Sequence, residues 1–229
     1  MNIAGLQKMT LLDFPARIAC TVFLPGCNLR CPFCHNASLV LPDREKDNIP
    51  ENELFAFLSS RRKKLDGVCV TGGEPTLYID LPDMLRRIKD LGFQVKLDTN
   101  GTNPGMLEQI VADGLCDYVA MDIKNSPQKY TATCGGIDVL ENAQKSAAIL
   151  MQGHVDYEFR TTVMHPFHTP GDLTAIGQWL QGAKRYFIQN FVDSGDLLSS
   201  GCEALTEPEM KELLDAVQEY IPSAKLRGL

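Results

Sequence analysis

Three cysteines stand close together near the start of the chain, at Cys27, Cys31 and Cys34, and Gly26 directly precedes them. Thiolates are soft ligands that select iron–sulfur clusters, zinc or copper(I). A closed structural zinc site takes four protein ligands, and no second Cys or His pair at zinc-finger spacing follows these three. A [4Fe–4S] cluster held by three cysteines leaves one iron without a protein ligand. The spacing therefore predicts an iron that is open to a substrate or cofactor.

The residues around these cysteines resemble a known family. The spacing C-x3-C-x2-C, with Phe33 before the last cysteine, is similar to the cluster loop of radical S-adenosylmethionine (SAM) enzymes. His35 and Asn36 then resemble the residues after the cluster in activating enzymes of glycyl radical enzymes, above all those of anaerobic ribonucleoside-triphosphate reductase. The resemblance implies that the three cysteines hold a [4Fe–4S] cluster, that SAM completes it, and that Phe33 lies beside these cofactors. In this family an electron from the cluster splits SAM into methionine and a 5′-deoxyadenosyl radical, so no side chain is expected to be catalytic by itself.

Composition excludes several classes of partner. The formal net charge is −7 and the isoelectric point is about 5.1. Nucleic acids and anionic membranes attract basic surfaces, so neither is an expected partner. The N-terminus has no apolar signal region, and no apolar run approaches the roughly 20 residues that span a bilayer. A cytoplasmic location is expected, where the cysteines stay reduced.

Glycines and polar residues follow the predicted strands at the point where each strand ends. A first strand over residues 18–24 leads into the cysteine loop, and a second over 67–71 leads into Gly72, Gly73 and Glu74. A third strand over 93–97 leads into Asp98 and Asn100. A fourth strand over 118–124 carries the charged side chains of Asp122 and Lys124, which must be paired, bound to a ligand or at the end of the strand. The carboxyl ends of parallel strands share one edge of a sheet, where α/β enzymes place their sites.

These motifs are also similar to those of the family, and the resemblance assigns them roles. Gly72, Gly73 and Glu74 resemble a motif whose backbone and Glu side chain hold the amino group of SAM. Asp98 and Asn100 resemble a motif beside SAM. Asp122 and Lys124 resemble another, whose lysine can pair with the SAM carboxylate. Gln189 and Asn190, at the end of a sixth strand over 185–191, are expected at the adenine or ribose, and Val192 and Asp193 stand where several members have a histidine.

Three further expectations concern ions and the substrate. Asp98, Thr99 and Asp122 are candidate ligands of a monovalent cation. By resemblance, Asp13, His35 and Arg160 are candidates to face a peptide substrate, although a surface arginine is an equal alternative for the last of these. His165 and His168 lack a third ligand, so zinc is not expected there, and no role is assigned to Cys134 or Cys202.

Six strand–helix alternations predict a parallel α/β sheet curved into a partial (βα)6 barrel that is open at one side, which is also the fold of the family. A single domain over residues 1–229 is expected, with a lead-in over 1–16 and a C-terminal helix over 206–221 that starts at the capping box of Thr206 and Glu209.

The function hypothesis is an activase that abstracts a Cα hydrogen from a glycine of a glycyl radical enzyme. Resemblance favours anaerobic ribonucleoside-triphosphate reductase as partner and reduced flavodoxin or ferredoxin as electron donor. One alternative is a radical SAM enzyme for a small molecule, similar to 7-carboxy-7-deazaguanine synthase. The other is a zinc-binding interaction module without catalysis.

Overall fold

The computed structural model describes residues 1–41, 48–193 and 195–228. It contains one sheet of eight strands, whose order in space is their order in the sequence. The strands are β1 (Gly5–Thr10), β2 (Ala19–Leu24), β3 (Gly67–Gly72), β4 (Gln94–Thr99), β5 (Tyr118–Asp122), β6 (Asp156–Val163), β7 (Tyr186–Asn190) and β8 (Lys225–Arg227). β1 pairs antiparallel with β2, and every later pair is parallel.

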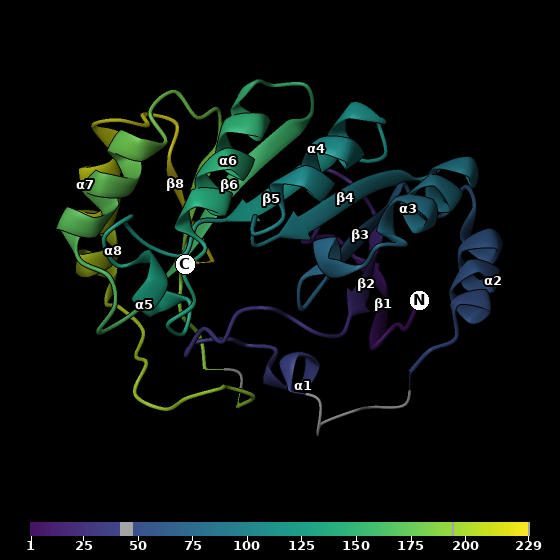
Figure 1. Ribbon diagram of the computed structural model, residues 1–229, viewed down its shortest axis with the longest axis horizontal. Coiled ribbons are helices and arrows are strands. Elements are labelled where there is room, and N and C mark those ends of the chain that lie inside the picture. Colours follow the sequence, from purple (N-terminus) through teal and green to yellow (C-terminus); the bar gives the residue numbers. More distant parts are fainter. Residues whose placement is uncertain (42–47, 194, 229) are drawn as a thin grey trace.

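Helices connect the parallel strands, and the longer ones cover the outside of the curved sheet, whereas α1 (Ala37–Val40) lies at its open edge (Figure 1). They are α1 (Ala37–Val40), α2 (Glu51–Arg61), the 3₁₀ helix η2 (Pro75–Leu77), α3 (Leu81–Asp90), α4 (Pro104–Ala112), α5 (Tyr130–Thr133), α6 (Leu140–Met151), α7 (Pro170–Trp179) and α8 (Glu207–Gln218). The first and last strands do not pair, so the sheet is an unclosed barrel, as predicted. In the described part of the chain no helix is long and apolar enough to cross a bilayer.

The six predicted strands correspond to β2 to β7, with ends that differ by one or two residues. β2, β3 and β5 are mostly β-branched and apolar runs with buried residues on both faces, which is why their pattern is readable. The capping box of Thr206 and Glu209 also forms as predicted, at the start of α8.

The two edge strands were not predicted. β1 exposes Gln7, Lys8 and Met9 in succession, so it lacks the apolar run of a buried strand. β8 is only three residues long. The lead-in over 1–16 is therefore partly a strand. It pairs with β2, the strand before the cysteine loop, with Gly5 opposite Phe23, and so adds an edge strand to the sheet.

Candidate functional site

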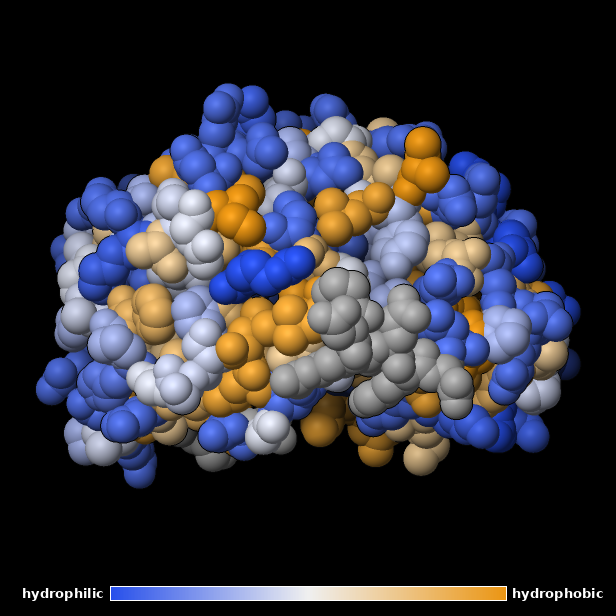
Figure 2. Space-filling view, turned by 60° about the horizontal axis from the view of Figure 1, so that its bottom comes forward, coloured by the Kyte–Doolittle hydropathy of each residue, from blue (hydrophilic) through white to orange (hydrophobic). Residues whose placement is uncertain are grey.

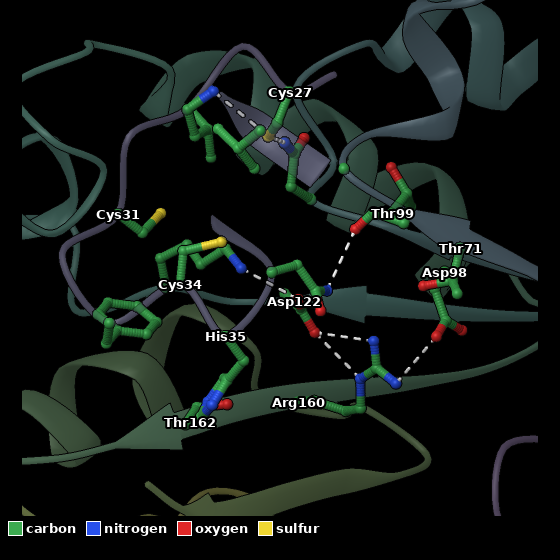
Figure 3. A pocket seen from close by; sticks show the side chains of 18 residues that line it. Cys27, Cys31, Cys34, His35, Thr71, Asp98, Thr99, Asp122, Arg160 and Thr162 are labelled. Carbon is green, nitrogen blue, oxygen red and sulfur yellow. Dashed lines mark hydrogen bonds and ion pairs between the residues drawn. The ribbon is translucent and has the colours of Figure 1, made fainter. Parts of the chain in front are cut away.

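A cavity of about 200 Å³ lies at the carboxyl ends of the parallel strands. Figure 3 shows three cysteines on one side of it and the ends of β3 to β6 on the other. Of the residues predicted from the sequence, the cavity is lined by Cys27, Cys31, Phe33, Cys34, His35, Gly72, Gly73, Asp98, Asn100, Asp122, Lys124 and Arg160. Glu74, Gln189, Asn190 and Asp13 are not among its lining residues. Most of the predicted site is thus brought together from segments far apart in the sequence.

The face that carries this edge of the sheet is shown in Figure 2. A band of hydrophobic side chains runs across its middle and is bordered by hydrophilic ones. Phe33 is buried below the surface and packs against Phe167, with ring centroids 6.3 Å apart. The cysteine loop is therefore seated on apolar contacts, which exclude water from one side of the thiols.

Two glycines allow the end of β3 to touch the cysteine loop. The Gly73 N–H donates to Leu24 O at 2.8 Å, and the Glu74 N–H donates to Gly26 O at 2.8 Å. A Cβ atom on Gly73 would lie 1.8 Å from Gly26 O, and one on Gly72, whose φ is +129°, would lie 2.2 Å from Leu24 O. No side chain fits at either position, so the glycine pair is required for the backbone contact itself.

The three thiols lie in different surroundings. Burial raises the pKa of Cys27 to about 11, although its sulfur accepts a hydrogen bond from the Leu29 N–H at 3.4 Å. Burial also raises the pKa of Cys34. A hydrogen bond from the Cys134 thiol instead lowers the pKa of Cys31 to about 7 and raises that of Cys134 itself. Cys31 is therefore the thiol most ready to bind a metal as thiolate.

The three thiols are available as ligands of an iron–sulfur cluster. Within the described ranges no three Cys, His, Asp or Glu side chains converge as ligands of one metal ion. Cys27, Cys31 and Cys34 instead face the cavity from separate points of the loop (Figure 3). Cysteines that bind different irons of one cluster need this separation, because each takes its own corner.

The Glu74 side chain is not among the residues that line the cavity, and its expected contact with the amino group of SAM stays a prediction. Its carboxylate is fully buried and accepts from the Thr76 N–H at 3.0 Å, the Thr76 hydroxyl at 2.5 Å, the Thr99 hydroxyl at 2.7 Å and the Asn100 N–H at 2.6 Å. Burial raises its pKa despite these donors. Glu74 thus fixes the loop after β4, and places Asn100 at the cavity.

Five charged side chains alternate in sign across β4, β5 and β6. Lys96 pairs with Asp98, and Arg160 contacts Asp98 at 3.4 Å and Asp122 at 3.0 Å. Lys124 completes the series with Asp122 at 3.0 Å. Burial alone would raise the pKa of Asp122, but Lys124 and Arg160 outweigh it and lower that pKa to about 2. Asp122 is therefore a fixed negative charge at the cavity.

The alternating charges bear on two expectations. Figure 3 shows the Arg160 guanidinium between Asp98 and Asp122, the two carboxylates expected to hold a monovalent cation. Arg160 is also only 16% exposed and is engaged in these ion pairs, although it was a candidate for the peptide substrate. It lines the cavity together with His35, whereas Asp13 does not and instead accepts a hydrogen bond from the Thr21 hydroxyl at 2.5 Å.

Gln189 and Asn190, the predicted adenine or ribose contacts at the end of β7, do not line the cavity, and that role stays a prediction. The Asn190 amide donates to Leu205 O at 2.7 Å and accepts from the Leu205 N–H at 3.0 Å, so it fastens the chain after β7. Several family members have a histidine where this chain has Val192 and Asp193. Beside that position, the His35 ring packs on Phe191 with ring centroids 5.4 Å apart. His165 pairs with Glu209 and His168 contacts Lys124 O, so the two histidines have separate partners.

Two threonines line the cavity that sequence reasoning did not select. Thr71 lies on β3 and Thr162 on β6. Side chains alternate between the faces of a strand, so Thr162 shares the face of Arg160. This alternation in the sequence could have been used to predict Thr162 at the cavity. No sequence pattern could have predicted the contact of Cys134 with Cys31, because it depends on how α5 packs.

Comparisons with known proteins agree with this geometry. Residues 21–180 match the family model described as the radical SAM superfamily. A relative from Methanocaldococcus jannaschii, with the name "Putative glycyl-radical enzyme activating enzyme", is 30% identical over 99% of this chain and 96% of its own length. The pyruvate formate-lyase-activating enzyme of Clostridium pasteurianum is 33% identical over 54% of this chain and 52% of its own length.

A solved structure supports the fold. A radical SAM methyltransferase from Sphaerobacter thermophilus superposes with a TM-score of 0.75 over 96% of this chain and 68% of that one, at 12% identity. The cysteine loop, the glycine pair of β3 and the polar ends of β4 and β5 all lie within the matched range of the family model. The chain therefore belongs to the radical SAM superfamily.

Proposed function

We propose that this chain is an activating enzyme for a glycyl radical enzyme. In the net reaction one electron and one SAM, with a Cα hydrogen from a glycine of the partner, give methionine, 5′-deoxyadenosine and a glycyl radical. One observation carries the proposal. The three thiols share a single cavity with Gly73, Asp98 and Asp122, in a chain whose relative of nearly equal length bears an activating enzyme's name.

The residues have distinct tasks in this proposal. Cys27, Cys31 and Cys34 hold a [4Fe–4S] cluster, and the cluster and SAM supply the radical chemistry when bound. The backbone of Gly72 and Gly73 is free of side chains at the cavity, so it can approach the SAM amino group. The Lys124 ammonium lies close to the cysteine loop and is the candidate partner of the SAM carboxylate.

The other residues predicted to contact SAM differ in whether they line the cavity. Asp98, Asn100 and Asp122 line the cavity and remain proposed SAM contacts, and Phe33 remains a proposed wall. Glu74 acts through Asn100, whose N–H it holds. A monovalent cation beside Asp98 and Asp122 stays a prediction, and it would have to share both carboxylates with Arg160.

The partner and the electron donor are proposed on resemblance. His35 and Asn36 after the last cysteine favour anaerobic ribonucleoside-triphosphate reductase as the protein substrate. Reduced flavodoxin or ferredoxin is the proposed electron donor, in a cytoplasmic setting. His35 and Arg160 line the cavity and remain candidates to meet the substrate glycine loop, whereas the position of Asp13 does not favour that role.

Anaerobic reconstitution tests the proposal. Protein loaded with iron and sulfide is reduced by dithionite with SAM, and 5′-deoxyadenosine is measured. We expect product from the wild type and from Cys202→Ala, a loop cysteine outside the cavity, but none from Cys31→Ala. Addition of the reductase should then give a glycyl radical signal in electron paramagnetic resonance.

Other outcomes assign the chain differently. SAM cleavage that yields a modified small molecule and no radical on any protein would favour the small-molecule enzyme. A colourless protein with one zinc and no SAM cleavage would reject both enzyme hypotheses and leave the interaction module.

A further inference from the structure

A segment near the C-terminus crosses the outside of the cysteine loop. Residues 195–200, here called the strap, lie between β7 and α8. Figure 1 shows this yellow-green segment passing beside α1, on the side of the molecule where the cysteine loop lies. The strap follows the range of the family model, which ends at residue 180. It thus lies outside the range that the family model describes.

Three hydrogen bonds join the strap to the cysteine loop. The Ser38 N–H donates to an Asp196 carboxylate oxygen at 2.9 Å, and the Ala37 N–H donates to Asp196 O at 3.3 Å. The Ser199 N–H donates to Pro32 O at 3.1 Å. These bonds lie on both sides of Cys34 in the sequence, one before it and two after it. The cysteine is therefore held between two fixed points.

Asp196 also supplies what α1 lacks at its start. The first N–H groups of a helix have no partner within the helix. Asn36 precedes α1 but makes no side-chain capping bond, so the carboxylate of Asp196 takes that place from about 160 residues away. A negative charge at a helix start is favourable, and a charge-assisted hydrogen bond is stronger than a neutral one.

The ends of the strap region are fastened to the barrel. Before it, the Phe191 N–H donates to Val163 O at 3.0 Å. After it, Glu203 and His165 exchange backbone hydrogen bonds of 2.9 and 3.2 Å, and the Asn190 amide holds Leu205. Because both ends of the strap region are bonded to residues in or next to β6 and β7, these strands determine where the middle of the strap lies against the cysteine loop.

We propose that the strap locks the cysteine loop in place and slows the loss of iron, and that Asp196 is its positioning residue. The proposal rests on the cluster proposed above. Release of iron requires Cys34 to move away, and the strap bonds must break for the loop to open. Removing the carboxylate should raise the rate of iron release about tenfold, the effect of one hydrogen bond of ordinary net strength.

The test is iron release from the reconstituted protein under anaerobic conditions, measured by the visible absorbance of the cluster after addition of a chelator. Asp196→Ala removes the carboxylate, and Asp196→Asn keeps an oxygen acceptor. Asp193→Ala is the matched control, because the Asp193 carboxylate accepts from the N–H of the strap residue Gly195 at 2.8 Å, a bond that does not join the strap to the cysteine loop. Ser199→Pro removes the N–H that Pro32 accepts and leaves Asp196 intact.

We expect release about tenfold faster from Asp196→Ala and faster from Ser199→Pro, release from Asp196→Asn between that of Asp196→Ala and the wild type, and release within about twofold of the wild type from Asp193→Ala. Thermal unfolding of the cluster-free proteins should show equal midpoints for Asp196→Ala and Asp193→Ala. Equal release rates for all variants would overturn the strap proposal, as would equal acceleration by Asp193→Ala. A wild type that takes up no cluster would instead reject the proposed function.

Discussion

The two ends of the barrel each bury a carboxylate, and they satisfy it in different ways. At the end opposite the cavity, Glu158 is 1% exposed and binds Arg227 with two hydrogen bonds of 2.7 and 2.8 Å. Tyr118 donates a third at 2.8 Å. At the cavity end, Glu74 is fully buried as well, but its four donors belong to Thr76, Thr99 and Asn100.

The difference separates a structural end from a chemical one. Burial alone would raise the pKa of Glu158, but Arg227 and Tyr118 outweigh it and the pKa is lowered. Burial raises the pKa of Glu74, and among the residues that the structure describes no cation pairs with it to offset this. The cations near the cavity are committed to Asp98 and Asp122 at its wall. Charges are thus paired at both ends, and the cavity end in addition presents thiols and backbone groups to a ligand.

The largest expected effect concerns the cavity end. Gly73→Ala would place a Cβ atom 1.8 Å from Gly26 O, so β3 and the cysteine loop must separate. We expect a loss of about 3 kcal/mol in the free energy of unfolding and failure to hold a cluster. Urea unfolding and iron content measure both.

Gly105→Ala is the control for that substitution. Its Cβ would meet no atom within 4 Å, and Gly105 lies in α4. Alanine there should change stability favourably by roughly 0.5 kcal/mol and leave iron content unchanged. Gly73→Ala protein with normal stability and iron would show that the close approach is not needed.

An intermediate effect is expected at the far end. Glu158→Gln leaves Arg227 without its carboxylate, and we expect a loss of about 2 kcal/mol at pH 7, since Arg227 is 34% exposed and partly solvated. The pKa of Glu158 is lowered on folding, so its contribution is present above the unfolded value of about 4.3 and disappears as pH falls through the folded value. The difference between variant and wild type should therefore vanish in acid.

Glu74→Gln is the comparison at the cavity end. The pKa of Glu74 is raised on folding, so ionised Glu74 weakens the wild type as pH rises from the unfolded to the folded value. Relative to the wild type, this variant should gain with rising pH, whereas Glu158→Gln should lose. Slopes of the same sign for the two variants in urea unfolding at several pH values would contradict the contrast between the ends.

The smallest expected effect tests the placement of Asn190. Asn190→Ala removes the amide that binds both backbone groups of Leu205, which should cost about 1 kcal/mol. Because Asn190 does not line the cavity, the dissociation constant of SAM in calorimetry should change less than about twofold. A tenfold weakening at unchanged stability would restore Asn190 to the adenine contact predicted from the sequence.

Local sequence patterns were sufficient for the six inner strands and for the position of the cavity. Strands such as Val68 to Val70 are apolar on both faces, and a polar motif follows each of them. The direction of the Glu74 side chain was not predictable, because it depends on Thr99 and Asn100 of another strand. Arg160, a candidate for the peptide substrate, lines the cavity, and its pairing with Asp98 and Asp122 could not be predicted because it requires the register of β5 and β6.

The order of the strands in the sheet has a consequence for how the protein is made. Because every strand lies beside its sequence neighbour, the barrel can assemble in the direction of synthesis. Cys34 leaves the ribosome about 160 residues before Asp196, which at about 5–20 residues per second is roughly 8–32 s. During that interval the cysteine loop has no strap across it. On the proposal that the strap locks this loop, we expect a nascent chain to be more open to cluster delivery than the finished one.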